Sequence, residues 1–465
     1  MVEFLTLFLG LVAGPQEIAV SVSDEVSRVE LRLDHELVAE LRAPDWKGDL
    51  DFGARPAPRW LEAVAFDATG RELARTRQAL NVPRPTAEAS LLVRREQNDA
   101  ARYVGQLVWE DALGGRLSFV DFALDSRPYE VERPERFPLP DPGTGRASLL
   151  EADLAFSSGT EASAQTVYGA PGLEVVGAEL TAVPLRSRRR ASAAQLERYL
   201  LGPDGTLDVV GTEREASSLI VVKGDGVSDA LLAMNTPFGD PDEHSSSTPV
   251  QRTTLTYTRE ITTDAAADAP NRRWTALPFP PRQSLVVMRP YARQRTGRSV
   301  DLELFAVSPS IARPKGGLLW LLNTDVEVPG LDPTVRLADA VAVAGLKAAE
   351  HNRRRAVLVV LETVPQDGSR IRFDAALEYL ASLGVPVHVW QLVEDPREEL
   401  VHPSAQAIRT YRQLRRAYEE LQADFSSQRT AWVAGRYLPH EIDLAAGAPF
   451  TLLADRADGA SSGIR

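Results

Sequence analysis

From Ile18 to Arg84 the chain alternates between apolar and polar positions with the period of two that is typical of β-strands with one buried face. The alternation runs through the segments IAVSV, VELRLDHELVAEL and WLEAVAFDATGRELARTRQALNV. In the last of these, residues 61–66 and 73–82 predict the two strands of a hairpin around a turn at 67–70. The two prolines that follow end the ladder, because proline has no N–H to donate. We predict a β-sandwich over residues 15–85.

A second β unit is predicted over residues 86–170. Strand composition recurs in LLVRRE, YVGQLVWE, LSFVDFAL and LLEADLAFSSGTEASAQTVYG. The last segment repeats the layout of the first hairpin, with a small polar turn containing glycine between two alternating strands. We interpret the two units as tandem sandwiches of immunoglobulin type.

After residue 171 the pattern changes to short, continuously apolar strands that alternate with helices. The strands are SSLIVV, AVLVVLE and VPVHVWQL, and the helices between the later ones are Leu337–Ala349 and FDAALEYLASLG. Strands of this kind are buried on both faces, which is typical of a parallel sheet covered by helices. We therefore predict an α/β domain over 171–465 with its core at 215–395. We also expect flanking strands, a polar insertion at 236–271 and a C-terminal helix from Pro403 to Gln428.

The N-terminal apolar run FLTLFLGLVA has two interpretations. Its ten residues would span about 15 Å as a helix, half of what a bilayer core requires, so no transmembrane segment is predicted. The length suits a secretory signal, and Val12 and Gly14 suit its cleavage site, although Glu3 stands where a basic residue is usual. We predict a signal peptide at 1–14 and export from the cytoplasm. The alternative is that the run forms a first buried strand.

Composition and motifs exclude several kinds of chemistry. The chain has no cysteine, which excludes a thiol nucleophile, a disulfide framework and a cysteine-based zinc site. Its formal net charge of −13 argues against a nucleic-acid partner, whose phosphates require a basic face. The sequence contains no His-Glu-x-x-His, no phosphate-binding loop and no Gly-x-Gly-x-x-Gly. We therefore predict that the protein is not an enzyme.

One stretch of the α/β region resembles a known family. The segment RLADAVAVAGLKAAEHNRRRAVLVVLETVPQDGSRIRFDAALEYLASLGVPVHVWQL resembles the later half of a von Willebrand factor type A domain. The segment YRQLRRAYEELQADFSSQRTAWVAGRY looks like the terminal helix and strand of the bacterial VWFA-related family. Together with the two predicted N-terminal immunoglobulin-like sandwiches, the resemblance implies a multi-domain α+β chain whose later part is a Rossmann-like α/β domain of von Willebrand A type.

The resemblance also implies a place for a divalent cation, at the C-terminal edge of the sheet. Domains of this type use an Asp-x-Ser-x-Ser loop, a threonine from a middle loop and an aspartate after a later strand. No Asp-x-Ser-x-Ser occurs here, and Lys223 stands beside the corresponding loop. The available residues are Asp225, Ser228, Thr334 and Glu362. We expect that the metal site is degenerate, with no metal and no cofactor. Binding of Mg²⁺ or another divalent cation through these four residues is the alternative.

The functional prediction follows from the fold and the missing motif. We expect a non-enzymatic, metal-independent protein–protein interaction or adhesion-type scaffold, periplasmic or secreted, from a bacterial cell. Its partner would be a protein, which no motif identifies, and nothing in the sequence indicates an oligomeric state. A divalent-cation-dependent ligand-binding domain and a hydrolase of unrecognised type are the alternatives.

Overall fold

The fold comes from a computed structural model of the whole chain. The structure describes residues 2–454 except 5, 7, 9–10, 23–24, 84–86, 97–98, 112–115, 126, 144–147, 158–160, 170–179, 188–191, 214–216, 234–253, 257–276, 281–282, 294–304, 309–310, 313–316, 324, 328–330, 351–352, 394 and 396. Among these residues, none of the helices is long and apolar enough to cross a membrane.

The first β-sandwich is present as predicted. One sheet has the order β1–β2–β5 and the other β4–β3–β6–β7. Their bounds are β1 Val2–Phe4, β2 Pro15–Val22, β3 Arg28–Leu33, β4 Glu36–Arg42, β5 Lys47–Asp51, β6 Arg59–Phe66 and β7 Glu72–Leu80. The alternation of the sequence places Ile18, Leu31 and Leu61, all fully buried, in the core between the sheets. The predicted hairpin is confirmed, since β6 and β7 pair antiparallel.

The N-terminal apolar run takes part in this sandwich. Strand β1 pairs antiparallel with β2, and Val2 and Val12 are both 4% exposed in its core. The side chain of Asn81 accepts from the Val12 amide at 2.7 Å and donates to the Val12 carbonyl at 3.0 Å. The run is thus packed into the sandwich, as the alternative interpretation expected, but the strand covers Val2–Phe4 and overlaps the run only at Phe4. Cleavage after Gly14 would remove β1 together with these contacts.

The second sandwich follows the same plan. Its sheets have the orders β12–β9–β8 and β11–β10–β13–β14. The bounds are β8 Ala87–Glu96, β9 Asp99–Asp111, β10 Leu117–Leu124, β11 Arg127–Tyr129, β12 Phe137–Leu139, β13 Ser148–Phe156 and β14 Glu161–Tyr168. Tyr103, Phe122, Leu150 and Phe156 pack between the sheets.

The strands predicted to flank the α/β core form a β unit with a core of its own. They come from both ends of the segment, residues 180–213 and 428–452, and form the sheets β18–β29–β15–β31 and β17–β16–β30. The bounds are β15 Leu180–Arg186, α1 Ala193–Glu197, β16 Leu200–Gly202, β17 Gly205–Thr206, β18 Val209–Glu213, β29 Gln428–Ala434, η3 Pro439–Glu441, β30 Asp443–Leu444 and β31 Thr451–Leu452. Leu185, Leu200 and Val433 are fully buried between these sheets.

The α/β unit is built on a sheet of order β22–β21–β19–β26–β27–β28. The neighbours from β21 to β28 pair in parallel, and β22 is an antiparallel edge strand. The bounds are β19 Ser217–Lys223, β21 Gln283–Arg293, β22 Phe305–Val307, β26 Arg354–Leu361, β27 Val387–Leu392 and β28 Gln406–Ile408. The short strands β23 Ile311–Ala312 and β25 Leu331–Val335 also pair with β21, and β20 Thr254–Thr256 pairs with β24 Asp325–Glu327.

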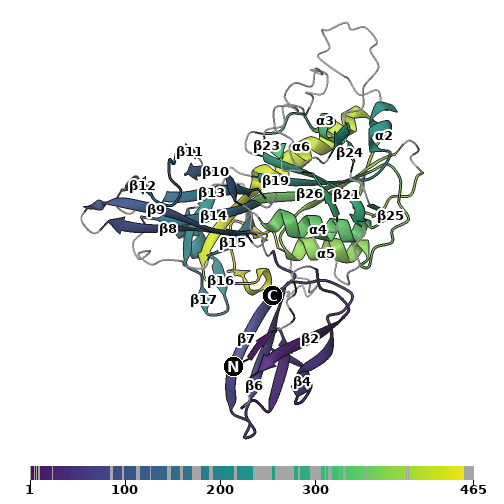
Figure 1. Ribbon diagram of the computed structural model, residues 1–465. Helices are drawn as coiled ribbons and strands as arrows, with labels where there is room; N and C mark the ends of the chain where they lie inside the picture. Colours follow the sequence, from purple (N-terminus) through teal and green to yellow (C-terminus); the bar gives the residue numbers. More distant parts are fainter. Residues whose placement is uncertain are drawn as a thin grey trace.

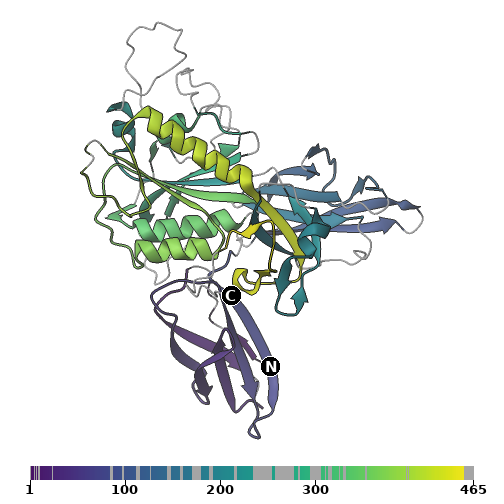
Figure 2. The ribbon, with the colours of Figure 1, turned by 180° about the vertical axis from the view of Figure 1, so that it is seen from behind.

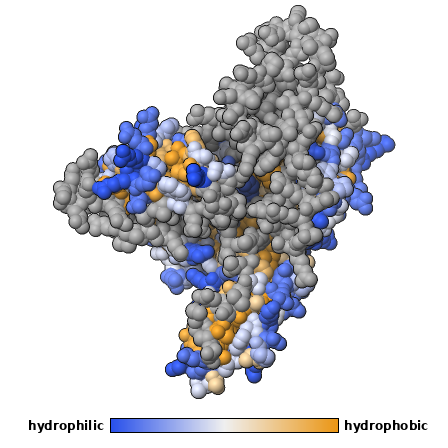
Figure 3. Space-filling model, in the orientation of Figure 1, coloured by the Kyte–Doolittle hydropathy of each residue, from blue (hydrophilic) through white to orange (hydrophobic). Residues whose placement is uncertain are grey.

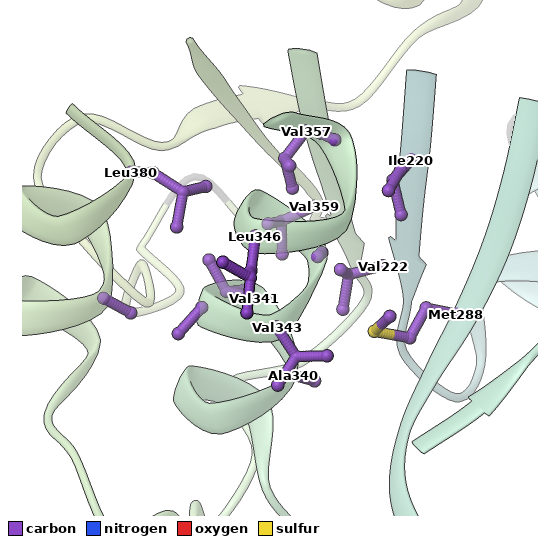
Figure 4. Close-up of a cluster of buried hydrophobic side chains, with 14 of the residues drawn as sticks. Ile220, Val222, Met288, Ala340, Val341, Val343, Leu346, Val357, Val359 and Leu380 are labelled. Atoms are coloured by element: carbon purple, nitrogen blue, oxygen red, sulfur yellow. The ribbon is translucent and has the colours of Figure 1, made fainter. Parts of the chain in front are cut away.

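Helices cover both faces of this sheet (Figures 1 and 2). Helices α4 Leu337–Glu350 and α5 Phe373–Ser382 lie on one face. The helices α2 Val227–Ala233, α3 Leu318–Asn323 and α6 Tyr411–Ser427 lie on the other. Figure 4 shows Val341 and Leu346 of α4 beside Val357 and Val359 of β26. Burial on both faces explains why the sequences of β19 and β26 are continuously apolar.

The C-terminal helix begins later than predicted. Residues 406–408 form the edge strand β28, and the helix starts at Tyr411. Thr410 caps it, because the threonine side chain accepts from the Gln413 amide while the Gln413 side chain accepts from the Thr410 amide. The core predicted at 215–395 therefore extends through α6. Of the insertion predicted at 236–271, only 254–256 lie among the described residues.

Candidate functional site

A pocket opens at the C-terminal edge of the parallel sheet, between the central strands β19 and β26. The chain leaves β19 toward β21 on one side and leaves β26 toward β27 on the other. In open α/β sheets, ligands bind beyond the carboxyl ends of the strands at such a reversal. The pocket has a volume of about 600 Å³. It is lined by Gly224, Asp225, Pro290, Tyr291, Pro333, Thr334, Val335, Leu361, Glu362, Thr363, Pro365, Gln366, Asp367 and Gly368. The described surface near β25, at the right of Figure 3, is largely hydrophilic.

Asp225 lies at the start of the loop after β19. The loop is fixed by the Gly224 amide, which donates to the Val360 carbonyl at 2.9 Å. One carboxylate oxygen of Asp225 accepts from the guanidinium of Arg289, and the other accepts from the hydroxyl of Tyr291. Both donors come from β21, two residues apart and therefore on one face of that strand. Asp225 is thus held by groups of its own chain.

The hydroxyl of Tyr291 stays protonated over the physiological range. Burial, together with the hydrogen bond to Asp225, raises the pKa of Tyr291 to about 12. Tyr291 therefore acts as a donor to the carboxylate and not as a proton acceptor.

Ser228 is turned away from the pocket. It lies in the first turn of α2 and is 6% exposed. Its hydroxyl accepts from the ammonium of Lys223 at 3.1 Å and donates to the Leu322 carbonyl at 3.4 Å. Lys223 itself is 1% exposed. The structure therefore does not bring Ser228 to the same place as the other candidate residues.

Thr334 and Glu362 line the pocket together with Asp225. The Thr334 amide donates to the carboxylate of Asp332 at 2.8 Å, which fixes the turn before α4. Glu362 lies against the loop after β19, because a Cβ atom added at Gly226 would be 1.7 Å from Glu362 Oε2. Gly226 also has a φ of +72°, which favours glycine. Three of the four residues predicted from the sequence thus share one pocket.

The loop after β26 is anchored to α4 by two aspartates that the sequence interpretation did not single out. Asp367 accepts from the amides of Leu337 and Ala338 at 2.9 and 3.1 Å, and so caps the start of α4. In return Asp339 accepts from the Arg370 amide at 3.1 Å. Burial raises the pKa of Asp339, and the amides of Arg370 and Ile371 act against that rise. These contacts hold the pocket wall in place.

Arg289 and Tyr291 were also missed. A sign of them was present in the segment LVVMRPYAR, where the apolar strand changes to alternating charged and aromatic residues at its C-terminal end. Among the described residues, no group of three or more histidine, aspartate or glutamate side chains is arranged to hold a metal ion.

Comparisons with known proteins leave the family open. No family model matches the chain, and no curated protein matches it. Fibronectin(III)-like modules of Clostridium thermocellum CbhA are 17% identical over 17% of this chain and 93% of theirs, with a TM-score of 0.16. Bacteroides uniformis beta-glucuronidase 3 is 12% identical over 36% of this chain and 24% of its own, with a TM-score of 0.18.

A third solved structure is the Bacteroides ovatus SGBP-B in complex with a mixed-linkage heptasaccharide. It is 10% identical over 45% of this chain and 57% of its own, with a TM-score of 0.13. At these TM-scores the likenesses carry no argument about fold or function. The resemblance to von Willebrand A domains therefore stays a prediction from the sequence.

Proposed function

We propose that the protein is a non-enzymatic, metal-independent interaction protein whose recognition site is the pocket at the C-terminal edge of the parallel sheet. In this proposal the α/β unit is a Rossmann-like domain of von Willebrand A type with a degenerate metal site. The observation that carries the proposal is the pairing of Asp225 with Arg289 and Tyr291. Asp225 is the residue to which the resemblance gives the first metal contact.

The chemistry of the donors opposes a divalent cation. Mg²⁺ requires near-octahedral oxygen ligands, and both oxygens of Asp225 already accept from donors of the chain. The guanidinium of Arg289 places a positive charge beside the carboxylate. Ser228, the second candidate ligand, is buried beside the ammonium of Lys223. A metal ion would have to displace one cation and approach another.

The topology supports the proposed domain type. Counted along the chain from β19 to β28, with β23 and β25 off the main path, the sheet has the strand order 3-2-1-4-5-6. This is the order of doubly wound, Rossmann-like sheets. The described lining of the pocket offers no histidine as a general base, and its tyrosine donates to Asp225.

Thermal unfolding tests whether the protein is independent of divalent cations. A ligand that binds the folded state at about 100 times its Kd stabilises it by about 2.7 kcal/mol, a shift of several degrees. We expect that MgCl₂, MnCl₂ and CaCl₂ at about 10 mM change the midpoint no more than NaCl of equal ionic strength. An ion-specific rise that Asp225→Asn abolishes would overturn the proposal in favour of the divalent-dependent alternative.

Photocrosslinking tests whether the pocket edge meets a partner. Val364 is 43% exposed and lies between two residues that line the pocket, which makes it a suitable site for p-benzoylphenylalanine. Phe119 of β10 is 60% exposed and serves as the matched control. In an extract of the source organism we expect an adduct at position 364, equal in EDTA and in MgCl₂, and none at position 119. Absence of an adduct at 364, or an equal yield at 119, would contradict the proposed recognition site.

Export is a separate proposal, which rests on the signal-like composition of residues 4–13. The intact mass of the protein recovered from its source organism tests it. A mature chain that starts at Pro15 supports export through a cleaved signal. A chain that still starts at Met1, with β1 in place, overturns it.

A further inference from the structure

The pocket at the C-terminal edge combines apolar walls with acidic groups. Its apolar surface comes from Pro290, Pro333, Val335, Leu361 and Pro365. Among the described residues that line it, the ionisable groups are three carboxylates and the hydroxyl of Tyr291, with no lysine or arginine. An apolar wall that leads to a carboxylate suits a side chain with an aliphatic stem and a cationic end.

The three carboxylates differ in whether they already have a partner within the chain. Asp225 is neutralised by Arg289. Asp367 accepts from the first amides of α4. Glu362 has no hydrogen bond and no ion pair in the part of the chain that the structure describes, although it lies in contact with the loop at Gly226. Glu362 is therefore the acidic group that remains available at the pocket.

We propose that this pocket accepts a lysine or arginine side chain presented by a protein partner, with the cationic end at Glu362 and the aliphatic stem along the proline and leucine wall. The inference rests on the proposed function, in which this pocket is the recognition site. In a metal-bridged site the bound cation would attract an acidic group of the partner. Here Arg289 of the chain already supplies the positive charge beside Asp225. The group that the chain offers to a partner is therefore the carboxylate of Glu362. Val364, at the edge of the pocket, offers an apolar contact to residues that flank the basic side chain.

Small derivatives of single amino acids test the charge preference directly on the full chain. The probes are N-acetyl-arginine amide and N-acetyl-lysine amide, with N-acetyl-glutamine amide and N-acetyl-glutamate amide for comparison. Saturation-transfer NMR reports which protons of the probe touch the protein. We expect transfer to the methylene protons of the two basic probes and much less to the neutral and acidic probes. We also expect the saturation transfer to the basic probes to weaken when NaCl rises from about 0.05 to about 0.5 M.

A pair of charge-matched variants locates the binding. Glu362→Gln removes the available carboxylate while keeping its shape, and Glu419→Gln removes the same charge from the exposed surface of α6. We expect Glu362→Gln to lower the affinity for the arginine derivative about five-fold or more, and Glu419→Gln to leave that affinity unchanged. Equal affinity in wild type and Glu362→Gln would overturn the inference. So would binding of the neutral probe as strong as that of the basic ones, a result that needs no variant.

The two proposals fail in different ways. If a divalent cation raises the thermal midpoint through Asp225, the proposed function fails whatever the probes do. If no divalent cation binds and the Val364 adduct forms, but the basic probes show no preference, the proposed function stands and the basic-side-chain inference is wrong.

Discussion

The two edges of the parallel sheet differ in what their charged side chains contact. At the N-terminal edge, Arg355 is 5% exposed and donates to the carbonyls of Ala349 and Gly384 at 3.1 and 3.3 Å. Its amide donates to the side chain of Gln428, the first residue of β29. Nearby, Arg353 pairs with Asp153 of the second sandwich. This edge is closed by other units of the chain.

At the C-terminal edge the charged groups contact one another and leave a pocket. Arg289 and Tyr291 hold Asp225, Asp367 caps α4, and Glu362 lines the pocket beside Gly226. The difference separates two tasks. Charges at the closed edge join units together, so their loss should cost stability. Charges at the open edge should be replaceable with little cost in stability and a larger cost in binding.

The largest effect is expected at Arg355. Burial lowers the pKa of Arg355 to about 10, so it stays charged at neutral pH. Arg355→Met leaves two carbonyls at helix ends without their donor, and we expect a loss of about 3 kcal/mol in the free energy of unfolding. Urea denaturation measures it. The control is Arg372→Met, whose side chain is 84% exposed, with an expected loss below about 0.5 kcal/mol. Equal losses would remove the distinction between buried and exposed charge.

Two tyrosines provide the next comparison. Tyr379, near the C-terminal end of α5, is 1% exposed and donates to the Asn81 carbonyl at 3.0 Å, which joins the first sandwich to the α/β unit. Tyr379→Phe leaves that carbonyl unsatisfied, at an expected cost of about 1.5 kcal/mol. For Tyr291→Phe at the open edge we expect less than about 0.5 kcal/mol, because the Asp225 side chain is 58% exposed and water replaces the donor. Chemical denaturation of both variants measures the two losses in the free energy of unfolding. A larger loss in Tyr291→Phe than in Tyr379→Phe would contradict the prediction.

Two glycines with positive φ distinguish the effect of backbone strain from the effect of displacing the Glu362 side chain. Gly226 has a φ of +72° and faces Glu362, whereas Gly447 has a φ of +81° and no atom within 4 Å of an added Cβ. We expect each alanine variant to lose about 1 kcal/mol from backbone strain, since the flexible Glu362 side chain can move aside. Only Gly226→Ala should also lower the affinity for the arginine derivative, because the added methyl group displaces the carboxylate of Glu362. Unchanged probe binding in Gly226→Ala would show that the position of Glu362 does not matter.

Much of the fold could be predicted because local pattern and burial agree. The apolar runs of β19 and β26 and the helices α4 and α5 were predictable because strands buried on both faces leave no polar alternation. The placement of Asp225, Thr334 and Glu362 at the C-terminal edge was implied by the resemblance to von Willebrand A domains, and the pocket contains all three. The two hairpins were predictable from the alternation of their strands together with the residues of their turns.

What could not be predicted depends on contacts between distant parts of the chain. Arg289 and Tyr291 reach Asp225 only because β21 pairs with β19 in the register Ser217 to Gln283, and no local pattern sets that register. The β unit formed by β15 and β29 joins residues that are more than 240 positions apart, as in the pair Leu180 and Ala434. The resemblance implied Ser228 as a candidate metal ligand, but α2 starts at Val227 and the Ser228 hydroxyl donates to the Leu322 carbonyl.

The smallest expected effect concerns acid stability at the closed edge. Asp424 of α6 accepts from Arg186, from His388 at 3.4 Å and from Gln428 at 3.2 Å. Burial alone would raise the pKa of Asp424, but the hydrogen bond from His388 and the charge of Arg186 outweigh it and lower the pKa. A carboxyl whose pKa is lowered by folding stabilises the protein above its unfolded pKa of about 3.9, and that contribution disappears as the pH falls through the folded value.

Asp424→Asn should therefore cost about 1 kcal/mol or less at neutral pH, and the difference from wild type should shrink below about pH 4. Urea denaturation at about pH 7, 5 and 3 measures the difference. Asp374→Asn is the matched control: hydrogen bonding to Arg372 lowers the pKa of Asp374 as well, but its side chain is 51% exposed. Because solvent and salt screen that pair, we expect no measurable loss there. If both variants lost the same stability at each pH, the contacts that bury Asp424 at the N-terminal edge would not strengthen its ion pair.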